Sequence, residues 1–320
     1  MKILIGSDRY GLDTVIPELS RRFPHVDFEL CTKRENLVKQ IADADAVIGW
    51  LSRDEFLAGK KLKWVQSPST GVDAFVRIPE LRDGDVILTN ARGTHGAPLA
   101  EHAMAMILTF TRGMKAYINA QAQKHWDPTV RAAGLTELTG STMGIVGYGV
   151  VGQAVAERAR GFGMRILAVD RYPSLQHAYI DSLEPIEGLE RLLKESDYVV
   201  VTLPYTPEND NFIGAAEMAL MKPTALLVGV SRGGVIDEHA LLKVLQEKKI
   251  AGAALDVVRK EPMPPDNPLW DLDNLLITPH AAGGSQLEAG RIRAIFVDNV
   301  RRFVEGEFPL RNTVNKKLGY

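Results

Sequence analysis

Short runs of apolar, often β-branched residues alternate with longer amphipathic stretches along the whole chain. Several of these runs are apolar throughout, which is typical of strands that helices cover on both faces. Strand and helix alternating on this scale favour parallel sheets with right-handed crossovers. The runs predict strands at Lys2–Gly6, Asp27–Cys31, Ala46–Trp50, Leu62–Gln66, Val86–Thr89, Met143–Val146, Arg165–Val169, Tyr198–Leu203, Ala225–Val230, Gly252–Asp256 and Asn274–Thr278.

The predicted strands form two series, one on each side of residue 100, so we expect two α/β domains. A length of 320 residues also exceeds what one hydrophobic core usually serves. The nearly all-apolar stretch Leu99–Thr111 predicts a buried helix that joins the domains. The stretch Ser285–Glu305 predicts a last amphipathic helix, which can cross back and make the first domain discontinuous.

Composition narrows the class of protein. The net charge is −2 and no tract is rich in Lys or Arg, which argues against nucleic acid and anionic membranes as partners. The single cysteine, Cys31, excludes an internal disulfide, fits a reducing compartment and is expected in the core. The apolar start Met1–Gly6 is too short for a signal peptide, and no run approaches the ~18 residues of a membrane span. We therefore expect a cytoplasmic protein.

The segment Gly147-Tyr148-Gly149-Val150-Val151-Gly152 has the pattern G-x-G-x-x-G. A predicted strand precedes it and the helix-compatible stretch Gln153–Arg160 follows it. In a dinucleotide-binding turn the first glycine permits the tight turn, the second lets the backbone approach the pyrophosphate, and the third lets the helix pack on its strand. We therefore predict a Rossmann-type, doubly wound sheet with the cofactor at this turn.

Asp170 ends the strand that follows the glycine turn. A carboxylate at this place accepts hydrogen bonds from a ribose diol and repels a 2′-phosphate, which favours NAD over NADP. Arg171, directly beside it, leaves NADP as the less favoured alternative, because an arginine there accommodates the phosphate.

Polar residues gather where the predicted strands of the second series end, at Pro204, Ser231-Arg232, Asp256-Val257 and His280, with Glu261 in the loop after Asp256. Ligands of open parallel sheets bind at this edge. Hydride transfer between a 2-hydroxy acid and a nicotinamide needs a cation for the carboxylate, a group that exchanges the alcohol proton, and a carboxylate beside that group. We assign Arg232, His280 and Glu261 to these roles.

Other interpretations of these residues stay open. Arg232 can be a solvated loop residue, His280 a helix cap and Glu261 a surface charge. A metal site from Asp256, Glu261 and His280 lacks a close-spaced histidine pair or cysteine ligands, so we expect no metal. A serine hydrolase is suggested by G-x-S-x-G at 229–233 followed by an aspartate and a histidine, but its helix should begin at Ser231, whereas the next predicted helix is capped by Asp237.

With these motifs the chain resembles the D-isomer-specific 2-hydroxyacid dehydrogenases along essentially its full length. The segments that carry the resemblance are Gly144–Gly149, Leu203–Pro207, Ser231–Asp237, Leu255–Val257 with Glu261-Pro262, and Thr278–His280. The resemblance implies that Arg232, Glu261 and His280 are the catalytic residues, that Asp256 contacts the nicotinamide carboxamide, and that Asp170 binds the ribose. We expect further cofactor contacts at Arg171, Leu203, Pro204, Val230, Ser231 and Gly283.

The resemblance also implies that the two domains bind different ligands. A flavodoxin-like substrate domain is expected at 1–98 and 286–320, and the NAD-binding domain at 99–285. Backbone amides near Leu51–Ser52 and Ser69-Thr70-Gly71 would bind the substrate carboxylate together with Arg232 and His280. A homodimer would form through Tyr117–Trp126, a stretch that is otherwise compatible with an exposed loop.

The chain departs from many relatives before Ala100-Glu101, where Arg92 and Gly96 replace a proline and a threonine. His95 in this segment either reaches the substrate or has no role. Glu261 argues against formate oxidation, since the relatives that oxidise formate lack it. We predict NADH-dependent reduction of a small 2-keto acid such as glyoxylate or hydroxypyruvate, with an NAD-binding corepressor as the alternative. Trp50, Leu51 and Tyr205 are candidates to line the pocket for the substrate's R group.

Overall fold

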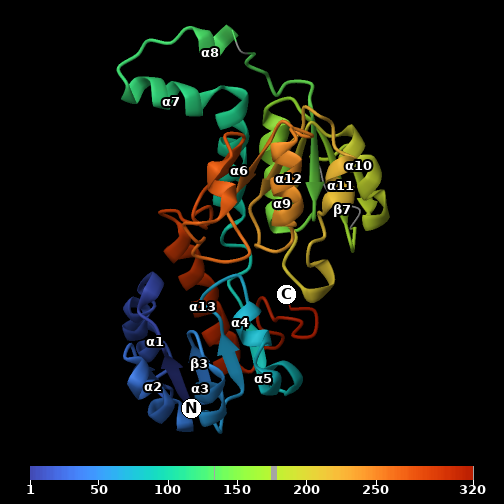
Figure 1. Ribbon diagram of the computed structural model, residues 1–320. Coiled ribbons are helices and arrows are strands. Elements are labelled where there is room, and N and C mark those ends of the chain that lie inside the picture. Colours follow the sequence, from blue (N-terminus) through green and yellow to red (C-terminus); the bar gives the residue numbers. More distant parts are fainter. Residues whose placement is uncertain (133, 174–178, 320) are drawn as a thin grey trace. The chain divides into compact units, whose positions relative to one another are not determined.

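The computed structural model describes residues 1–132, 134–173 and 179–319 and consists of two compact units (Figure 1). The first unit comprises 1–95 and 285–320, and the second comprises 96–284. The sequence-based limits at residues 98 and 286 fall three residues and one residue later than these divisions. Among the described residues, no helix is long and apolar enough to cross a membrane.

The first unit contains a five-stranded sheet whose strands are all parallel. Its order, β2-β1-β3-β4-β5, is the flavodoxin-like order, as predicted. The strands are β1 (Lys2–Ile5), β2 (Asp27–Leu30), β3 (Ala46–Ile48), β4 (Trp64–Gln66) and β5 (Ile87–Thr89). The helices are α1 (Ile16–Arg22), α2 (Arg34–Gln40), α3 (Arg53–Ala58), α4 (Asp73–Val76), α5 (Pro79–Asp83) and α13 (Glu288–Glu305).

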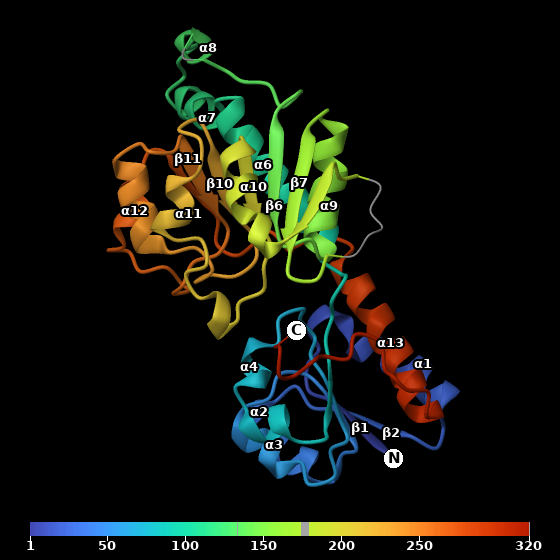
Figure 2. The same ribbon diagram turned by 90° about the vertical axis from the view of Figure 1, so that its right-hand side faces the viewer.

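Helix α13 returns the chain to the first unit and makes that unit discontinuous. Its apolar face, which includes Ile292, Phe296 and Val300, lies in one core cluster with Leu19 of α1 and Trp64 of β4. Figure 2 shows α13 beside α1. The predicted last helix is therefore present, although it begins at Glu288 rather than Ser285.

The second unit contains a seven-stranded parallel sheet in the order β12-β11-β10-β9-β6-β7-β8. The chain runs outward from β6 in one direction and from β9 in the other, so the strand order reverses between these two neighbours. The strands are β6 (Thr142–Val146), β7 (Arg165–Asp170), β8 (Ser182–Pro185), β9 (Tyr198–Val201), β10 (Leu226–Gly229), β11 (Gly252–Leu255) and β12 (Leu275–Ile277). The helices are α6 (Gly96–Thr111), α7 (Met114–Ala122), α8 (Thr129–Ala132), α9 (Val150–Gly161), α10 (Leu189–Glu195), α11 (Ala215–Ala219) and α12 (Glu238–Gln246).

Successive residues of the central strands bury their side chains in different clusters on the two faces of this sheet. Val199 and Leu227 lie in the cluster that α10, α11 and α12 complete. Their neighbours Val200 and Val228 lie in the cluster of α6 and α9. Because both faces are covered, these strands are apolar at every position, which is the pattern that predicted them.

Strand β8 was not predicted. Among the described strands it pairs with β7 alone, at the edge of the sheet, and its residues Ser182–Pro185 are half-exposed or exposed. An edge strand needs no continuous apolar run, so hydrophobic periodicity does not detect it. Helix α6 also begins earlier than predicted, at Gly96, and includes Pro98 in its first turn, where proline is tolerated.

Candidate active site

The glycine turn lies between β6 and α9, next to the point where strand order reverses. Gly147 has φ of +96°, a conformation that side chains disfavour. A Cβ on Gly152 would lie 2.2 Å from the carbonyl oxygen of Gly147, so only glycine lets the helix pack so close. A Cβ on Gly149 would meet nothing within 4 Å, which leaves open space beside the N-terminus of α9. The turn therefore has the shape that a pyrophosphate requires.

Asp170 ends β7 and lies against this turn. Its Oδ2 accepts a hydrogen bond from the Tyr148 amide at 2.6 Å, and its Oδ1 accepts one from the Tyr172 amide at 2.8 Å. Each oxygen keeps a further lone pair for a ligand hydroxyl. Arg171 pairs with Glu208 at 2.7 Å, so a second carboxylate lies next to that guanidinium. Burial raises the pKa of the Tyr148 phenol.

Three predicted residues follow three neighbouring strands at one edge of the sheet. Arg232 comes after β10, Asp256 directly after β11, and His280 after β12. These strands are adjacent and parallel, so their carboxyl ends lie side by side. The guanidinium of Arg232 donates to the carbonyl of Ser231 at 2.7 Å.

His280 and Glu261 form a hydrogen-bonded pair, with 2.7 Å between Nδ1 and Oε2. An ionised carboxylate only accepts hydrogen bonds, so Nδ1 carries the proton of this bond. The other oxygen of Glu261 accepts from the Val258 amide at 3.1 Å, which fixes the carboxylate. The imidazole is half-exposed, at 46%, and the pair leaves Nε2 for an external partner. This is the orienting arrangement of a general acid and base.

The backbone of His280 is in the left-handed region, with φ of +52°. Asp256 holds it there. The His280 amide donates to the Asp256 carbonyl at 2.8 Å, and the Asp256 carboxylate accepts from the amides of Ala281 and Ala282, each at 2.9 Å. Asp256 is 1% exposed, so in this structure its side chain braces the loop that carries His280. The predicted contact of Asp256 with the nicotinamide carboxamide would use the carboxylate lone pairs that these hydrogen bonds leave.

Two residues of this network were assigned no role from the sequence, although Thr278 belongs to the motif Thr278–His280. Thr278 donates to Asp256 at 2.5 Å, and His102 of α6 lies 2.9 Å from the Thr278 hydroxyl. The signal for His102 was present, since it is a titratable residue inside an almost wholly apolar helix. For Thr278 the motif gave no role, because a threonine at the end of a strand is ordinary.

The expected substrate loop lies at the carboxyl edge of the first unit's sheet, after β4. The Ser69 hydroxyl donates to the Gly71 carbonyl at 2.8 Å, and the Ser69 carbonyl accepts from the Ala91 amide. Within the described parts of the chain, the amides of Thr70 and Gly71 have no protein acceptor. Leu51, after β3, is 5% exposed, and its neighbour Trp50 lies 5.5 Å from the guanidinium of Arg9.

The remaining predicted cofactor contacts differ in accessibility. Leu203 lies against the turn, because a Cβ on Gly147 would be 3.2 Å from its amide. Pro204 is exposed, and Ser231 and Gly283 are half-buried. Val230 is 1% exposed, so any contact it makes would be through its backbone. Tyr205, a candidate for the R-group pocket, packs against the core of the second unit.

The structure offers little for the other interpretations. After Ser231 no helix begins until Glu238, where the Asp237 carboxylate caps α12 by accepting from the amides of residues 239 and 240. Ser231 is therefore not on a nucleophile elbow, which needs the helix to start at the serine. Among the described residues no cluster of His, Cys, Asp or Glu has the arrangement of a metal site.

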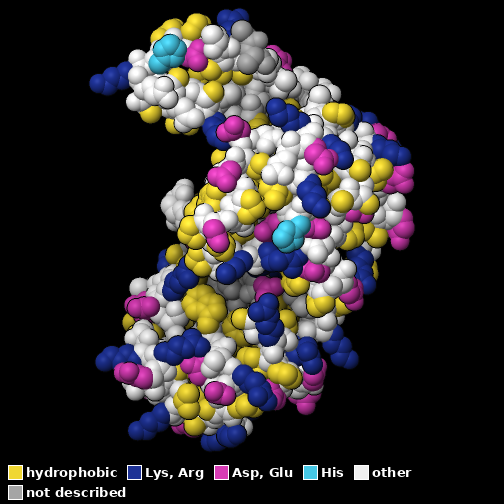
Figure 3. All heavy atoms as spheres, in the orientation of Figure 1, with side chains coloured by type: hydrophobic (Ala, Val, Ile, Leu, Met, Phe, Trp, Pro, Cys, Tyr) yellow, Lys and Arg dark blue, Asp and Glu magenta, His cyan; other side chains and the backbone are white. Residues whose placement is uncertain are grey.

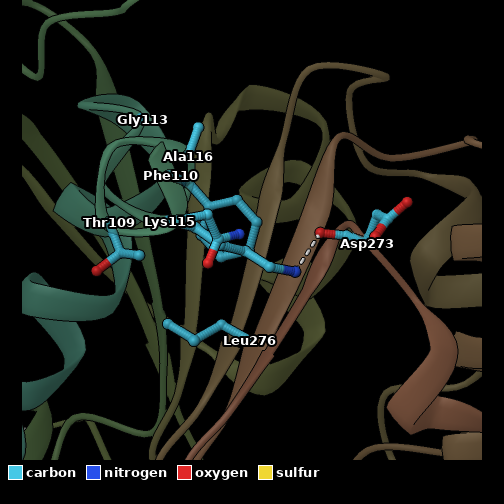
Figure 4. A pocket seen from close by; sticks show the side chains of 8 residues that line it. Thr109, Phe110, Gly113, Lys115, Ala116, Asp273 and Leu276 are labelled. Atoms are coloured by element: carbon cyan, nitrogen blue, oxygen red, sulfur yellow. Dashed lines mark hydrogen bonds between the residues drawn. The ribbon is translucent and has the colours of Figure 1, made fainter. Parts of the chain in front are cut away.

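A separate cavity of about 320 Å³ opens at the opposite edge of this sheet (Figure 4). It lies between the end of α6, the start of α7 and β12, and Lys115 crosses it to the Asp273 carbonyl at 2.9 Å. Because Asp273 precedes β12, the cavity is at the amino ends of the parallel strands. The cavity is therefore separate from Arg232, Asp256 and His280, which follow the carboxyl ends of the strands.

Comparisons with known proteins agree with this geometry. The sequence model of the D-isomer specific 2-hydroxyacid dehydrogenase NAD binding domain matches residues 104–282. A glyoxylate reductase from Korarchaeum cryptofilum is 35% identical over 320 residues, which cover 95% of this chain and 94% of that protein. The chain belongs to the D-isomer specific 2-hydroxyacid dehydrogenase family. It is therefore a 2-hydroxyacid dehydrogenase, and its second unit is the NAD(P)-binding domain.

Solved structures match the dehydrogenase over its whole length. A D-isomer specific 2-hydroxyacid dehydrogenase family protein from Aeromonas salmonicida has a TM-score of 0.86 and 30% identity, with 98% of this chain and 99% of that chain covered. An NADPH-dependent glyoxylate/hydroxypyruvate reductase from Sinorhizobium meliloti, in complex with NADP and sulfate, has a TM-score of 0.84 and 26% identity, with 100% and 99% covered. The predicted family, fold class and enzyme class are confirmed.

Proposed function

We propose that this dehydrogenase uses NADH to reduce a small 2-keto acid, glyoxylate or hydroxypyruvate, to the D-2-hydroxy acid. The observation that carries the proposal is the His280–Glu261 pair, which leaves Nε2 for a substrate at the ligand-binding edge of the dinucleotide-binding unit. The names of the relatives from Korarchaeum cryptofilum and Sinorhizobium meliloti support this substrate class.

NADH, when bound, would supply hydride to C2 of the keto acid. His280 donates the proton from Nε2 to the carbonyl oxygen, so that hydride and proton together complete the alcohol. Glu261 holds the proton on Nδ1 and stabilises the charged imidazole before the transfer. Arg232 binds the substrate carboxylate and polarises the carbonyl, because a planar guanidinium is suited to both roles.

The first unit is the substrate domain in this proposal. The amides of Thr70 and Gly71, which have no protein acceptor in the described chain, bind the substrate carboxylate as hydrogen-bond donors. Two backbone amides can satisfy two lone pairs of a carboxylate. Leu51 and Trp50 lie on the same sheet edge and line the pocket for a small R group.

NAD is the proposed cofactor. Asp170 accepts from the ribose hydroxyls with the lone pairs that Tyr148 and Tyr172 leave. A 2′-phosphate would face this carboxylate and Glu208, while Glu208 already offsets the charge of Arg171. The net field at this site therefore disfavours NADP.

The dehydrogenase is proposed to act as a homodimer through the region of α7. The part of the chain that the structure describes buries no residue of α7, and Figure 1 shows α7 and α8 projecting from the rest of the second unit. Hydrophobic side chains show on this segment in Figure 3, and Trp126 is 93% exposed. An apolar surface of this kind is typical of an interface.

The proposed function is tested by following NADH oxidation with a panel of 2-keto acids that includes glyoxylate, hydroxypyruvate, pyruvate and 2-ketoglutarate. We expect the highest kcat/KM with glyoxylate or hydroxypyruvate. Chiral chromatography of the hydroxypyruvate product should give D-glycerate alone. L-glycerate would overturn the assigned stereochemistry, and no turnover with any 2-keto acid would favour a binding-only, regulatory role.

A further inference from the structure

His95 lies at the centre of a buried hydrogen-bond network in the first unit. Its Nδ1 is 2.8 Å from the hydroxyls of both Thr70 and Thr94, and its Nε2 is 2.9 Å from Oε1 of Glu288. The side chains of His95 and Glu288 are only 14% and 21% exposed, and Thr94 is 2% exposed. A loop histidine without a role does not need three partners at such distances.

The directions of these bonds follow from counting protons. The Glu288 carboxylate only accepts, so Nε2 carries a proton and Nδ1 of the neutral ring is an acceptor. Two hydroxyls then compete to donate to Nδ1 and to the Ala91 carbonyl. The Thr94 hydroxyl lies 2.8 Å from that carbonyl and the Thr70 hydroxyl 3.2 Å. Thr94 therefore donates to Ala91, and Thr70 donates to His95.

The network connects the two places where the chain passes between the units. His95 is the last residue of the first unit before the chain enters the second unit. Glu288 begins α13, three residues after Ser285, where the chain returns to the first unit. Arg291, one turn later in α13, donates to the Thr94 carbonyl at 3.1 Å. Burial, followed by the charge of Glu288, raises the pKa of the nearby Tyr10 phenol. Helix α13 thus anchors His95 through Glu288.

Thr70 is the middle residue of the loop whose free amides the proposed function assigns to the substrate carboxylate. Asn90 donates to the Thr70 carbonyl at 2.8 Å, so the backbone of this residue is fixed at its carbonyl and its side chain is fixed by His95. Amides that bind an anion need to be held in position before the ligand arrives.

We propose that His95, anchored by Glu288, is a positioning residue that holds Thr70 and the 69–71 loop in the geometry that binds the substrate carboxylate. This inference rests on the proposed reduction of a 2-keto acid. His95 acts through Thr70 and does not itself touch the reacting atoms. Its loss should therefore raise the KM for the keto acid more than it lowers kcat, and should leave NADH binding to the second unit unchanged.

The test compares two substitutions that each keep one half of the imidazole. His95→Gln places an amide near the position of Nε2 and loses the Thr70 bond, whereas His95→Asn keeps an amide near Nδ1 and loses Glu288. We expect His95→Gln to raise the KM for glyoxylate about tenfold, as the loss of one buried hydrogen bond implies. We expect His95→Asn to raise the KM less than His95→Gln does. The exposed His25→Gln in the same unit is the matched control, with no change expected.

A double-mutant cycle separates positioning from general destabilisation. Thr70→Val should raise the KM as much as His95→Gln, and the double variant should raise it no further. Multiplicative effects, or an unchanged KM in His95→Gln while the wild-type enzyme turns over, would overturn the proposal. Fluorescence titration with NADH should give the same Kd for every variant.

Hydrogen exchange gives a readout that does not depend on turnover. A peptide covering residues 67–72 should exchange faster in His95→Gln than in the wild-type protein, and as slowly as wild type in His25→Gln. If the wild-type protein reduced no 2-keto acid, the proposed function would fail by that result. The exchange comparison would then decide the role of His95 alone, since equal rates overturn it and faster exchange supports it.

Discussion

At the scale of single residues, hydrogen bonds hold both the backbone and the side chain of His280. A non-glycine residue at φ of +52° is uncommon and persists only where its surroundings enforce it. Here the carbonyl and carboxylate of Asp256 fix residues 280–282, while Glu261 fixes the ring. The sequence predicted Glu261 and His280 at one sheet edge, and the structure pairs them. The hydrogen bond from His102 to Thr278 was not predictable, since it depends on where α6 packs.

Asp170 carries the first prediction. A 2′-phosphate would be repelled by the Asp170 carboxylate, and unit charges at ~4 Å interact by about 1–4 kcal/mol between bulk water and a protein surface. Asp170→Ala should therefore raise the ratio of kcat/KM for NADPH to that for NADH at least about tenfold. The ratio is measured from initial rates with each cofactor at saturating keto acid.

Glu208→Gln is the companion variant for this prediction. It removes the charge that pairs with Arg171, so the ratio should shift in the same direction and by less. A wild-type enzyme that already prefers NADPH would contradict the assignment of NAD, whatever the variants do.

At the scale of elements, the glycine turn and α9 are the part of the site that sequence predicted most completely. Gly147 requires glycine for its positive φ and Gly152 for the close packing of the helix, and both reasons are local in the chain, whereas Gly149 keeps space open beside the turn. Most strands were likewise predictable, because both faces of each sheet are covered. The edge strand β8 was not predictable, since it lacks an apolar run. The start of α6 was not predictable either, since the helix begins before Pro98, and a proline usually marks a helix boundary.

Gly152→Ala tests the packing of α9 on the turn. The added Cβ would lie 2.2 Å from the carbonyl oxygen of Gly147, so the backbone must move. Overpacking of this kind costs about 1–3 kcal/mol in the free energy of unfolding. We expect a lower Tm and an NADH Kd raised at least about tenfold, measured by thermal unfolding and fluorescence titration.

Gly161→Ala is the matched control in the same helix, because its Cβ would meet nothing within 4 Å. It should leave the NADH Kd unchanged and raise stability by up to about 1 kcal/mol, since alanine favours the helix. Equal NADH affinity in both variants would show that the turn does not bind the cofactor.

At the scale of the whole molecule, the chain builds two parallel-sheet units with different strand orders and returns to the first through α13. Alternation of strand and helix predicted two α/β domains, but periodicity cannot order the strands. The flavodoxin-like and Rossmann-type orders came from the resemblance and from the glycine turn. Assembly depends on surfaces that only the structure displays, above all the unburied α7.

The proposed homodimer predicts the effect of a charge on α7. Ile118 is 58% exposed, and Ile118→Lys would place an unpaired ammonium in the interface. We expect the mass from light scattering to fall from that of a dimer toward that of one chain. Val38→Lys, a similarly exposed position of the first unit, should leave the mass unchanged. A wild-type protein that elutes as a monomer would refute the dimer directly.

The central claim is that His280, oriented by Glu261, supplies the proton during hydride transfer. It is tested most directly by the kcat of glyoxylate reduction in His280→Ala, with NADH binding measured on the same sample and exposed His239→Ala as control. We predict a loss of about 10²–10⁴-fold in kcat at unchanged NADH affinity, the usual contribution of a positioned acid. Turnover by His280→Ala at the wild-type rate would contradict the claim.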